Sequence, residues 1–203
     1  MREYPQAFSA SQSRDFLAQL LQQIPWQQDT LRIAGKQIKV PRLQCWMGDH
    51  GSRYGYSGIR FEPCPWNDAV LAIRERVATL TGTAFNSVLL NYYRSGQDSV
   101  AWHADDEPEL GPAPVIASVS FGAPRQFQLK HKHQQTPQKY RLTLADGSLL
   151  FMGKGLQNNW LHQLPKLRNL YAPRVNLTFR IIVNGGGQPE HEKGACQGGK
   201  EPG

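Results

Sequence analysis

Apolar residues recur at helical spacing in two segments of the first half of the chain. In residues 11–26 serines precede the apolar stripe and a proline ends it. In residues 65–82 Asn67 or Asp68 can cap the segment and Gly82 can end it. The two stripes consist of Phe16, Leu17, Leu20, Leu21 and Ile24, and of Trp66, Val70, Ile73, Val77 and Leu80. We therefore expect two helices.

Most other ordered segments have the short apolar or alternating runs of β-strands, bounded by glycine and proline turns. These runs cover residues 31–34, 37–40, 87–93, 115–121, 126–130, 139–144, 148–152 and 174–183. Two early helices followed by many short strands predict an α+β chain that is mainly β. We expect a β-sandwich or jelly roll with both helices packed on one face.

The 203 residues suit a single domain, which we place at residues 1–184, and the Gly-rich residues 185–203 are expected to form a flexible tail. The chain starts without the apolar run of a signal peptide and contains no apolar stretch long enough to span a membrane. Cys45, Cys64 and Cys196 are far apart and form no CxxC pair, which favours reduced thiols and a cytoplasmic location.

The formal net charge of +7 favours a polyanionic partner, and nucleic acid is the commonest one. For a bacterial protein this would mean association with the nucleoid. Nothing in the sequence requires more than a monomer. Many basic proteins bind nothing anionic, so the charge needs support from a site.

Against this positive charge, the stretch WHADDEPEL at residues 102–110 concentrates four carboxylates beside a histidine. On a strand, His103 and Asp105 would point to the same face and could share a metal ion. His162 is the best third ligand, since His131 and His133 lie in a basic run and the other histidines lie in loops or the tail. Two imidazoles and one carboxylate form the facial arrangement of non-haem Fe(II) sites. The alternatives are a solvated acidic loop and a hydrogen-bonded structural histidine.

The sequence RVNLTFRIIV at residues 174–183 alternates strictly. Its apolar residues point one way, and Arg174, Asn176, Thr178 and Arg180 point the other. The two arginine Cα atoms would be about 20 Å apart on an extended strand, and their side chains could lean inward to hold the two ends of a small dicarboxylate. The alternative is a half-exposed strand with two solvated arginines.

These residues together resemble the AlkB-type dioxygenases, which depend on Fe(II) and 2-oxoglutarate and use dioxygen as a cosubstrate. The resemblance rests on HxD at 103–105, the later His162, RVNLTFR at 174–180, and the continuous stretches FNSVLLNYYRSGQDSVAWHADDEPEL and PVIASVSFG. It covers about residues 30–183 and is closest to the members that repair duplex DNA. It implies a double-stranded β-helix, which agrees with the jelly roll expected from the pattern.

The resemblance also implies roles for individual residues. His103, Asp105 and His162 would be catalytic and would hold the iron. The 2-oxoglutarate would be bound by Asn91, Tyr93, Ser118, Arg174, Asn176, Thr178 and Arg180. The activity implied is hydroxylation of N-alkyl groups such as those of 1-methyladenine and 3-methylcytosine in DNA, with release of formaldehyde and succinate.

On the substrate side, the resemblance places a nucleotide-recognition lid at about residues 35–60 and the β-helix core at about 87–183. A base flipped out of the duplex needs an aromatic platform, for which we expect Tyr56 with Tyr54 beside it. Asp106 and Glu107 would favour cationic lesions over neutral bases. The expected phosphate contacts are Arg42, Lys36 and Lys39, and the basic residues of 130–133 with Lys139 and Arg141.

Two other functions stay open at this point. The same chemistry could act on RNA or tRNA, a protein or a small molecule, and the basic charge with the platform tyrosine favours nucleic acid. A metal-free or zinc-bearing jelly-roll binding module is the non-catalytic alternative. It leaves the combination of RxNxTFR with Asn91 and Tyr93 without an explanation.

Overall fold

The computed structural model describes residues 1–33, 35–49, 54–56, 59–61, 63–134 and 139–183. The elements are β1 (Arg2–Tyr4), α1 (Ala10–Gln23), β2 (Thr30–Ile33), β3 (Lys36–Lys39), β4 (Leu43–Gly48), β5 (Tyr54–Tyr56), β6 (Ile59–Phe61), α2 (Asp68–Thr81), β7 (Ser87–Tyr93), β8 (Val100–His103), a 3₁₀ turn (Pro108–Leu110), β9 (Ile116–Gly122), β10 (Arg125–His131), β11 (Lys139–Leu144), β12 (Ser148–Met152), α3 (Leu156–Asn159), β13 (Trp160–Leu164) and β14 (Arg174–Arg180).

Both predicted helices are present, and α2 begins at the predicted cap Asn67, whereas the cap of α1 is Ser9, which precedes the serines of residues 11–26. Ser9 and Gln12 form a reciprocal capping box at the start of α1, in which each side chain accepts a backbone N–H of the other. The Asn67 side chain accepts the N–H of Ala69 (2.9 Å) at the start of α2. Gly82 ends α2 with a φ of 67°, a left-handed conformation that costs glycine little.

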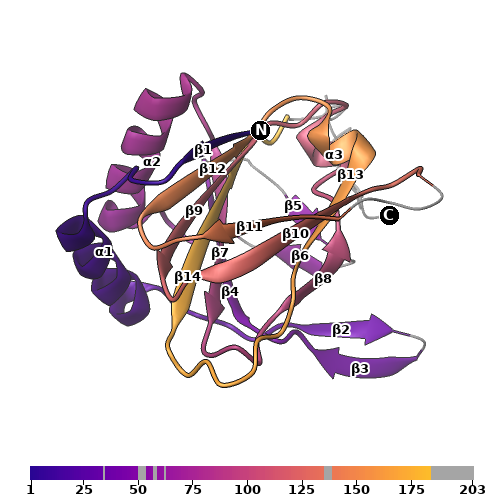
Figure 1. Ribbon diagram of the computed structural model, residues 1–203, viewed down its shortest axis with the longest axis horizontal. Helices are drawn as coiled ribbons and strands as arrows, with labels where there is room; N and C mark the ends of the chain where they lie inside the picture. The colour runs from indigo at the N-terminus through magenta and orange to yellow at the C-terminus, as the bar shows by residue number, and fades with distance from the viewer. Residues whose placement is uncertain (34, 50–53, 57–58, 62, 135–138, 184–203) are drawn as a thin grey trace, which may run out of the picture.

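Two antiparallel sheets face each other as in a jelly roll (Figure 1). The major sheet has six strands in the order β1-β12-β9-β14-β7-β4, and the minor sheet has four in the order β11-β10-β13-β8. Both long helices lie on the outer side of the major sheet, where α1 contacts β9 and β14 (Figure 1). The mainly β fold with its helices on one face is confirmed.

Strand β14 separates two hydrophobic clusters, because its side chains alternate between the two faces of the major sheet. Val175, Leu177 and Phe179 are fully buried in the cluster beneath α1 and α2. The polar side chains of β14 point into the space between the sheets, where a second cluster includes Leu89 and Phe127. The alternation predicted for residues 174–180 therefore produces one apolar and one polar buried face.

The pattern missed several strands and extended another. All four central residues of β4 are buried, so β4 lacks the alternation by which half-exposed strands are recognised. The strands β1, β5, β6, β8 and β13 were also missed. The strand expected at 174–183 ends at Arg180, because its pairing with β7 ends there and the Asn86 side chain takes over the backbone groups of Ile182.

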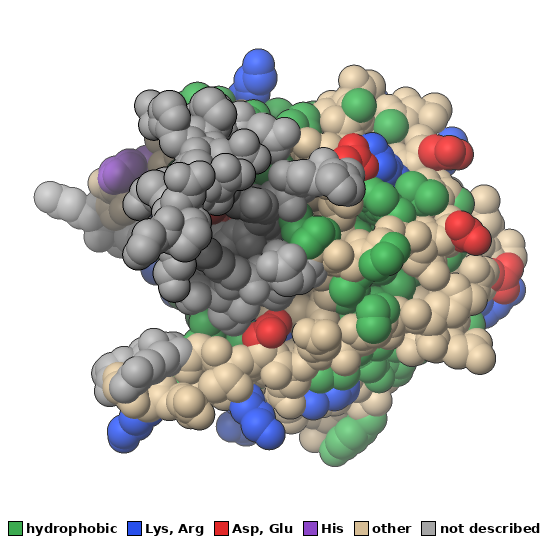
Figure 2. Space-filling view, turned by 180° about the vertical axis from the view of Figure 1, so that it is seen from behind, with side chains coloured by type: hydrophobic (Ala, Val, Ile, Leu, Met, Phe, Trp, Pro, Cys, Tyr) green, Lys and Arg blue, Asp and Glu red, His purple; other side chains and the backbone are tan. Residues whose placement is uncertain are grey.

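The predicted lid range 35–60 contains β4, which is one of the two edge strands of the major sheet. The hairpin β2–β3, which also overlaps this range, exposes Lys36 and Lys39, and basic side chains lie along it at the lower left of Figure 2. The predicted tail at residues 185–203 lies outside the described residues. Among the described helices, none combines the length and apolarity needed to cross a membrane.

Candidate metal and dicarboxylate site

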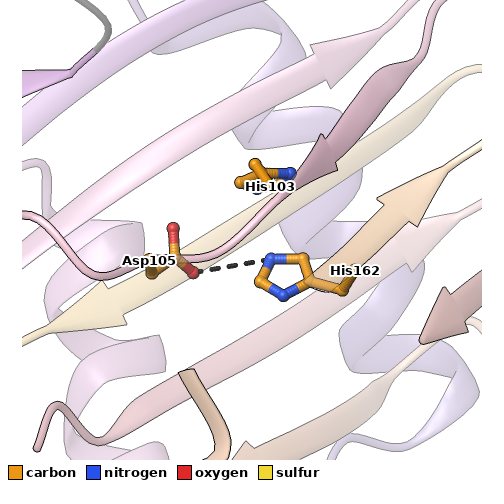
Figure 3. Close-up of side chains that lie close together, drawn as sticks. All are labelled: His103, Asp105 and His162. Carbon is orange, nitrogen blue, oxygen red and sulfur yellow. Dashed lines mark ion pairs between the residues drawn. The ribbon is translucent and has the colours of Figure 1, made fainter. Parts of the chain in front are cut away.

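Three predicted metal ligands meet between the two sheets. His103 ends β8, Asp105 follows two residues later, and His162 lies in β13, where it is the direct cross-strand partner of His103. The shared face inferred for His103 and Asp105 assumed that both lie on a strand, whereas β8 ends at His103 and Asp105 lies just beyond it. In Figure 3 the three side chains converge on one space.

The ligand atoms of these three residues all lie within 4.8 Å of one another. Nε2 of His162 is 3.8 Å from Oδ2 of Asp105 (Figure 3), and the two imidazole centroids are 4.2 Å apart. Nδ1 of His103 is 2.8 Å from the carbonyl oxygen of Ala101, which fixes the ring. Phe127 stacks on His162 at 5.2 Å. This geometry suits three ligands on one side of a divalent cation.

The ionisation of the three groups also suits a metal. Burial, together with the nearby His103 and Arg180, lowers the pKa of His162 to about 3, against the opposing effect of Asp105. Burial likewise lowers the pKa of His103. Burial alone would raise the pKa of Asp105, but the positive charge of Arg180 and the two imidazoles outweigh it and lower this pKa. Two neutral imidazoles and one carboxylate therefore face each other at neutral pH.

Asp105 is positioned by two partners from distant parts of the chain. Its carboxylate forms an ion pair with the guanidinium of Arg180 at the end of β14. Its backbone N–H donates to Oε1 of Gln157 (3.0 Å), a fully buried side chain in the short helix α3. Sequence reasoning missed Gln157, because only the fold brings α3 beside the end of β8.

The polar face of β14 continues away from the three ligands. Asn176 donates through Nδ2 to Ser118 Oγ and to the carbonyl of Val119 (both 2.8 Å), and Thr178 donates to Asn176 Oδ1 (3.0 Å). One continuous cavity is lined by these residues, the three ligands, Asn91, Tyr93 and Arg180. The residues expected at a dicarboxylate site on grounds of sequence are thus brought together.

Arg174 forms the far end of the cavity and has unused hydrogen-bonding capacity. Its Nη2 donates to Ser120 Oγ (2.8 Å), but within the described structure Nε and Nη1 have no partner. The side chain is only 2% exposed. Burial lowers the pKa of Arg174 to about 10, partly offset by Tyr93, whose ring lies 5.1 Å from the guanidinium carbon. A buried guanidinium whose Nε and Nη1 have no hydrogen-bond partner suits the binding of a carboxylate.

Arg42 does not lie where the sequence placed it. We expected a surface contact to phosphate, but the side chain is 6% exposed and lines the same cavity. Its Nε donates to Oδ1 of Asn91 (2.7 Å), which also accepts from Gln44 (3.1 Å). The cause is strand order: β4 is the neighbour of β7, which sets Gln44 directly opposite Asn91. Arg42 and Gln44 therefore position a pocket residue.

Comparison with known proteins agrees with this geometry. The sequence profile of the 2OG-Fe(II) oxygenase superfamily matches residues 1–180. The chain belongs to this superfamily. It is 40% identical over 190 residues to the mouse (Mus musculus) protein "DNA oxidative demethylase ALKBH2", which covers 89% of this chain and 80% of that protein.

Two further proteins show the extent of the likeness. The human (Homo sapiens) "Alpha-ketoglutarate-dependent dioxygenase alkB homolog 3" is 39% identical over 187 residues, covering 88% of this chain and 65% of that protein. The solved structure of OsALKBH1 superposes with a TM-score of 0.52 at 18% identity, over 88% of this chain and 96% of that one, and supports the fold alone.

The oxygenase superfamily uses Fe(II), 2-oxoglutarate and dioxygen, and the residues present fit the first two. The His103, Asp105 and His162 cluster offers nitrogen and carboxylate ligands of the kind that Fe(II) accepts. Arg180 lies against this cluster, whereas Arg174 lies at the opposite end of the same cavity. The arrangement can hold a metal at one end and a carboxylate at the other.

Two predicted substrate residues, Asp106 and Glu107, directly follow the ligand Asp105 along the chain but do not line the cavity. Asp106 is exposed and forms an ion pair with Lys132 Nζ (2.7 Å), which comes from the turn after β10. Glu107 is half-buried and precedes the 3₁₀ turn at Pro108–Leu110. Tyr54 and Tyr56 belong to β5, but their side chains lie outside what the structure describes, so their platform role stays a prediction.

Proposed function

We propose that this chain is an oxidative demethylase that removes N-alkyl groups, such as those of 1-methyladenine and 3-methylcytosine, from DNA. The observation that carries this proposal is the 40% identity to a protein named DNA oxidative demethylase, 80% of whose length the match covers. The three candidate metal ligands and the cavity lined by arginines support the oxygenase chemistry. The net charge of +7 supports a nucleic acid substrate.

In this proposal His103, Asp105 and His162 hold Fe(II), and the dicarboxylate spans the cavity from Arg180 beside the metal to Arg174 at the far end. The idle Nε and Nη1 atoms of Arg174 would receive the distal carboxylate. The residues between the two arginines that would complete the binding site are Asn91, Tyr93, Ser118, Asn176 and Thr178.

Bound Fe(II), 2-oxoglutarate and dioxygen supply the oxidant that hydroxylates the N-methyl carbon, with 2-oxoglutarate converted to succinate and carbon dioxide. The hydroxymethylated base then releases formaldehyde. The chain's own contribution is orientation and exclusion of water. Apolar side chains close the cavity around its polar groups and include Leu89, Phe127, Leu144, Met152 and Leu164. A dry cavity strengthens each ionic contact within it.

We infer that Asp106 and Glu107, which directly follow the metal ligand Asp105, favour cationic lesions. The ion pair with Lys132 tempers this preference, because it offsets the negative charge of Asp106. We expect Lys132→Met to raise the selectivity for cationic 1-methyladenine over neutral 3-methylthymine by about threefold, a size typical of an exposed ion pair. Competition between the two lesions measures this ratio, and Lys154→Met, in the turn before α3, serves as the control. An unchanged ratio would contradict the role given to Asp106.

The decisive assay incubates the protein with Fe(II), ascorbate, 2-oxoglutarate and oligonucleotides that carry 1-methyladenine. Single-stranded DNA, duplex DNA and RNA form separate arms. We expect loss of the methyl mass from DNA with an equal amount of succinate. Succinate without demethylation in any arm would assign another substrate, and faster turnover of RNA than of either DNA would overturn the DNA assignment. A monomer is our proposal for the oligomeric state, and sedimentation velocity tests it.

A further inference from the structure

Arg125, at the start of β10, is a buried cation to which the proposed function gives no task. Its side chain is only 2% exposed and is among the largest fully buried side chains of the protein. Burial lowers its pKa, while Tyr93 and Asp98 act in the opposite direction. A guanidinium is costly to bury unless its donors are satisfied, so its partners indicate what it does.

Three backbone carbonyls accept from this one guanidinium. Nη2 donates to the carbonyls of Asp98 (2.9 Å) and Pro165 (2.7 Å), and Nη1 donates to that of Ser95 (3.3 Å). The carboxylate of Asp98 is engaged elsewhere, in an ion pair with Arg94 (2.8 Å). Arg125 therefore holds separate backbone segments together through hydrogen bonds.

The backbone segments bonded to Arg125 adjoin the strands that provide the metal and dicarboxylate residues. Ser95 and Asp98 lie in the loop between β7, which ends in Tyr93, and β8, which ends in His103. Pro165 directly follows β13, the strand of His162. One side chain thus links the ends of three strands that provide the metal and dicarboxylate residues.

Arg125 also lies beside the far end of the cavity. Its guanidinium carbon is 5.7 Å from the centre of the Tyr93 ring, and that of Arg174 is 5.1 Å from the same ring. The positive charge of Arg125 contributes to lowering the pKa of Arg174. The two guanidiniums are therefore close enough for both charges to attract a carboxylate held at Arg174.

We propose that Arg125 is a positioning residue for 2-oxoglutarate. It holds the β7–β8 loop, which follows Tyr93, through two carbonyls and the end of β13 through a third, and it adds a second positive charge near Arg174. The inference rests on the 2-oxoglutarate site of the proposed function. The same loop is held separately by hydrogen bonds of Gly96 with Leu167 and Leu170 (both 2.8 Å), so the fold does not depend on Arg125 alone.

The test measures the dissociation constant of 2-oxoglutarate by calorimetry on Mn(II)-loaded protein without oxygen. Arg125→Met removes both the hydrogen bonds of the guanidinium and its positive charge. We expect the Kd to rise about tenfold, the equivalent of one lost charged hydrogen bond. Arg125→Lys keeps the charge but cannot reach three carbonyls, so we expect a smaller rise. In turnover assays KM for 2-oxoglutarate should rise in parallel, with kcat at saturation within about twofold of wild type.

A matched control separates positioning from general destabilisation. Ile73 is fully buried in α2, on the outer side of the major sheet and remote from the cavity. Ile73→Val should lower the melting temperature without changing the Kd. Wild-type Kd values in both folded Arg125 variants, or an equal rise in Ile73→Val, would overturn the inference. If Arg125→Met fails to fold, Arg125→Lys decides by the same criterion. Failure of the wild-type protein to bind 2-oxoglutarate would instead refute the proposed function.

Discussion

The two ends of the central cavity are built for opposite charges. At one end His103, Asp105 and His162 offer electron pairs, and Arg180 compensates the single carboxylate. At the other end Arg174 offers buried N–H donors, with Arg125 and Tyr93 close by. Both ends lie along one face of β14, which spans the distance between them. A single small molecule can join the two ends if it coordinates the metal cation at one end and places a carboxylate against Arg174 at the other.

Metal binding should be lost completely when Asp105, the one carboxylate among the three ligands, is removed. In Asp105→Ala two buried neutral imidazoles remain and Arg180 loses its anionic partner. We expect no stoichiometric metal binding and no formaldehyde release. Metal content by electron paramagnetic resonance of Mn(II) provides the measurement, and Glu109→Ala on the neighbouring 3₁₀ turn provides the control. Stoichiometric metal binding by Asp105→Ala would refute the assignment of this ligand.

A change at Arg174, at the far end of the cavity, should weaken dicarboxylate binding and leave metal binding intact. Arg174→Met removes a buried charged fork, and we expect the Kd of 2-oxoglutarate to rise about 100-fold, the equivalent of roughly 3 kcal/mol. Mn(II) binding should stay within about twofold of wild type. Calorimetry with each ligand in turn measures both. Parallel loss of metal binding would show that the two ends are not separable.

A smaller effect is expected where the metal end is supported from α3. Gln157→Leu has nearly the same volume but leaves the buried N–H of Asp105 without its acceptor. Metal affinity should fall about tenfold, as is typical when a group that orients a ligand is removed. Asn158→Leu, at an exposed position of α3, is the matched control. Wild-type affinity for Mn(II) in Gln157→Leu would show that Asp105 is oriented without it.

How far the sequence predicts this site depends on whether the information is local. His103 with Asp105, and Arg174 with Arg180, stand close together in the sequence, so their spacing suggests a shared face, and the family resemblance is needed to assign a shared site. Arg42, Gln157 and Arg125 act through strand order and loop packing, which no local pattern reveals. The two helices were predictable from periodicity and caps, whereas β4 was not, because a strand buried on both faces lacks alternation.

The smallest predicted effect concerns pH and Asp98, in the loop between β7 and β8. Burial alone would raise the pKa of Asp98, but hydrogen bonds from Arg94 lower it below its ordinary value of 3.8. A carboxyl with a depressed pKa stabilises the fold above its unfolded pKa, and this contribution is lost as the pH falls through the folded value. Asp98→Asn should therefore be less stable than wild type at pH 7, with the difference shrinking below about pH 4.

Urea unfolding of both proteins at pH 7 and pH 3 measures this difference. Arg94 is 43% exposed, so we expect a modest value. A difference that stays constant with pH would show that Asp98 acts through its shape and not through its charge.

We propose that one molecule of 2-oxoglutarate joins the two ends of the cavity. An anaerobic titration of the Fe(II)-loaded protein with 2-oxoglutarate, followed by the visible charge-transfer absorption of the chelate, tests this directly. We expect a saturable band with one molecule bound per chain, which is absent in Asp105→Ala and shifted to higher concentrations in Arg174→Met. Absence of the band in iron-loaded wild-type protein, or an unshifted titration in Arg174→Met, would contradict it.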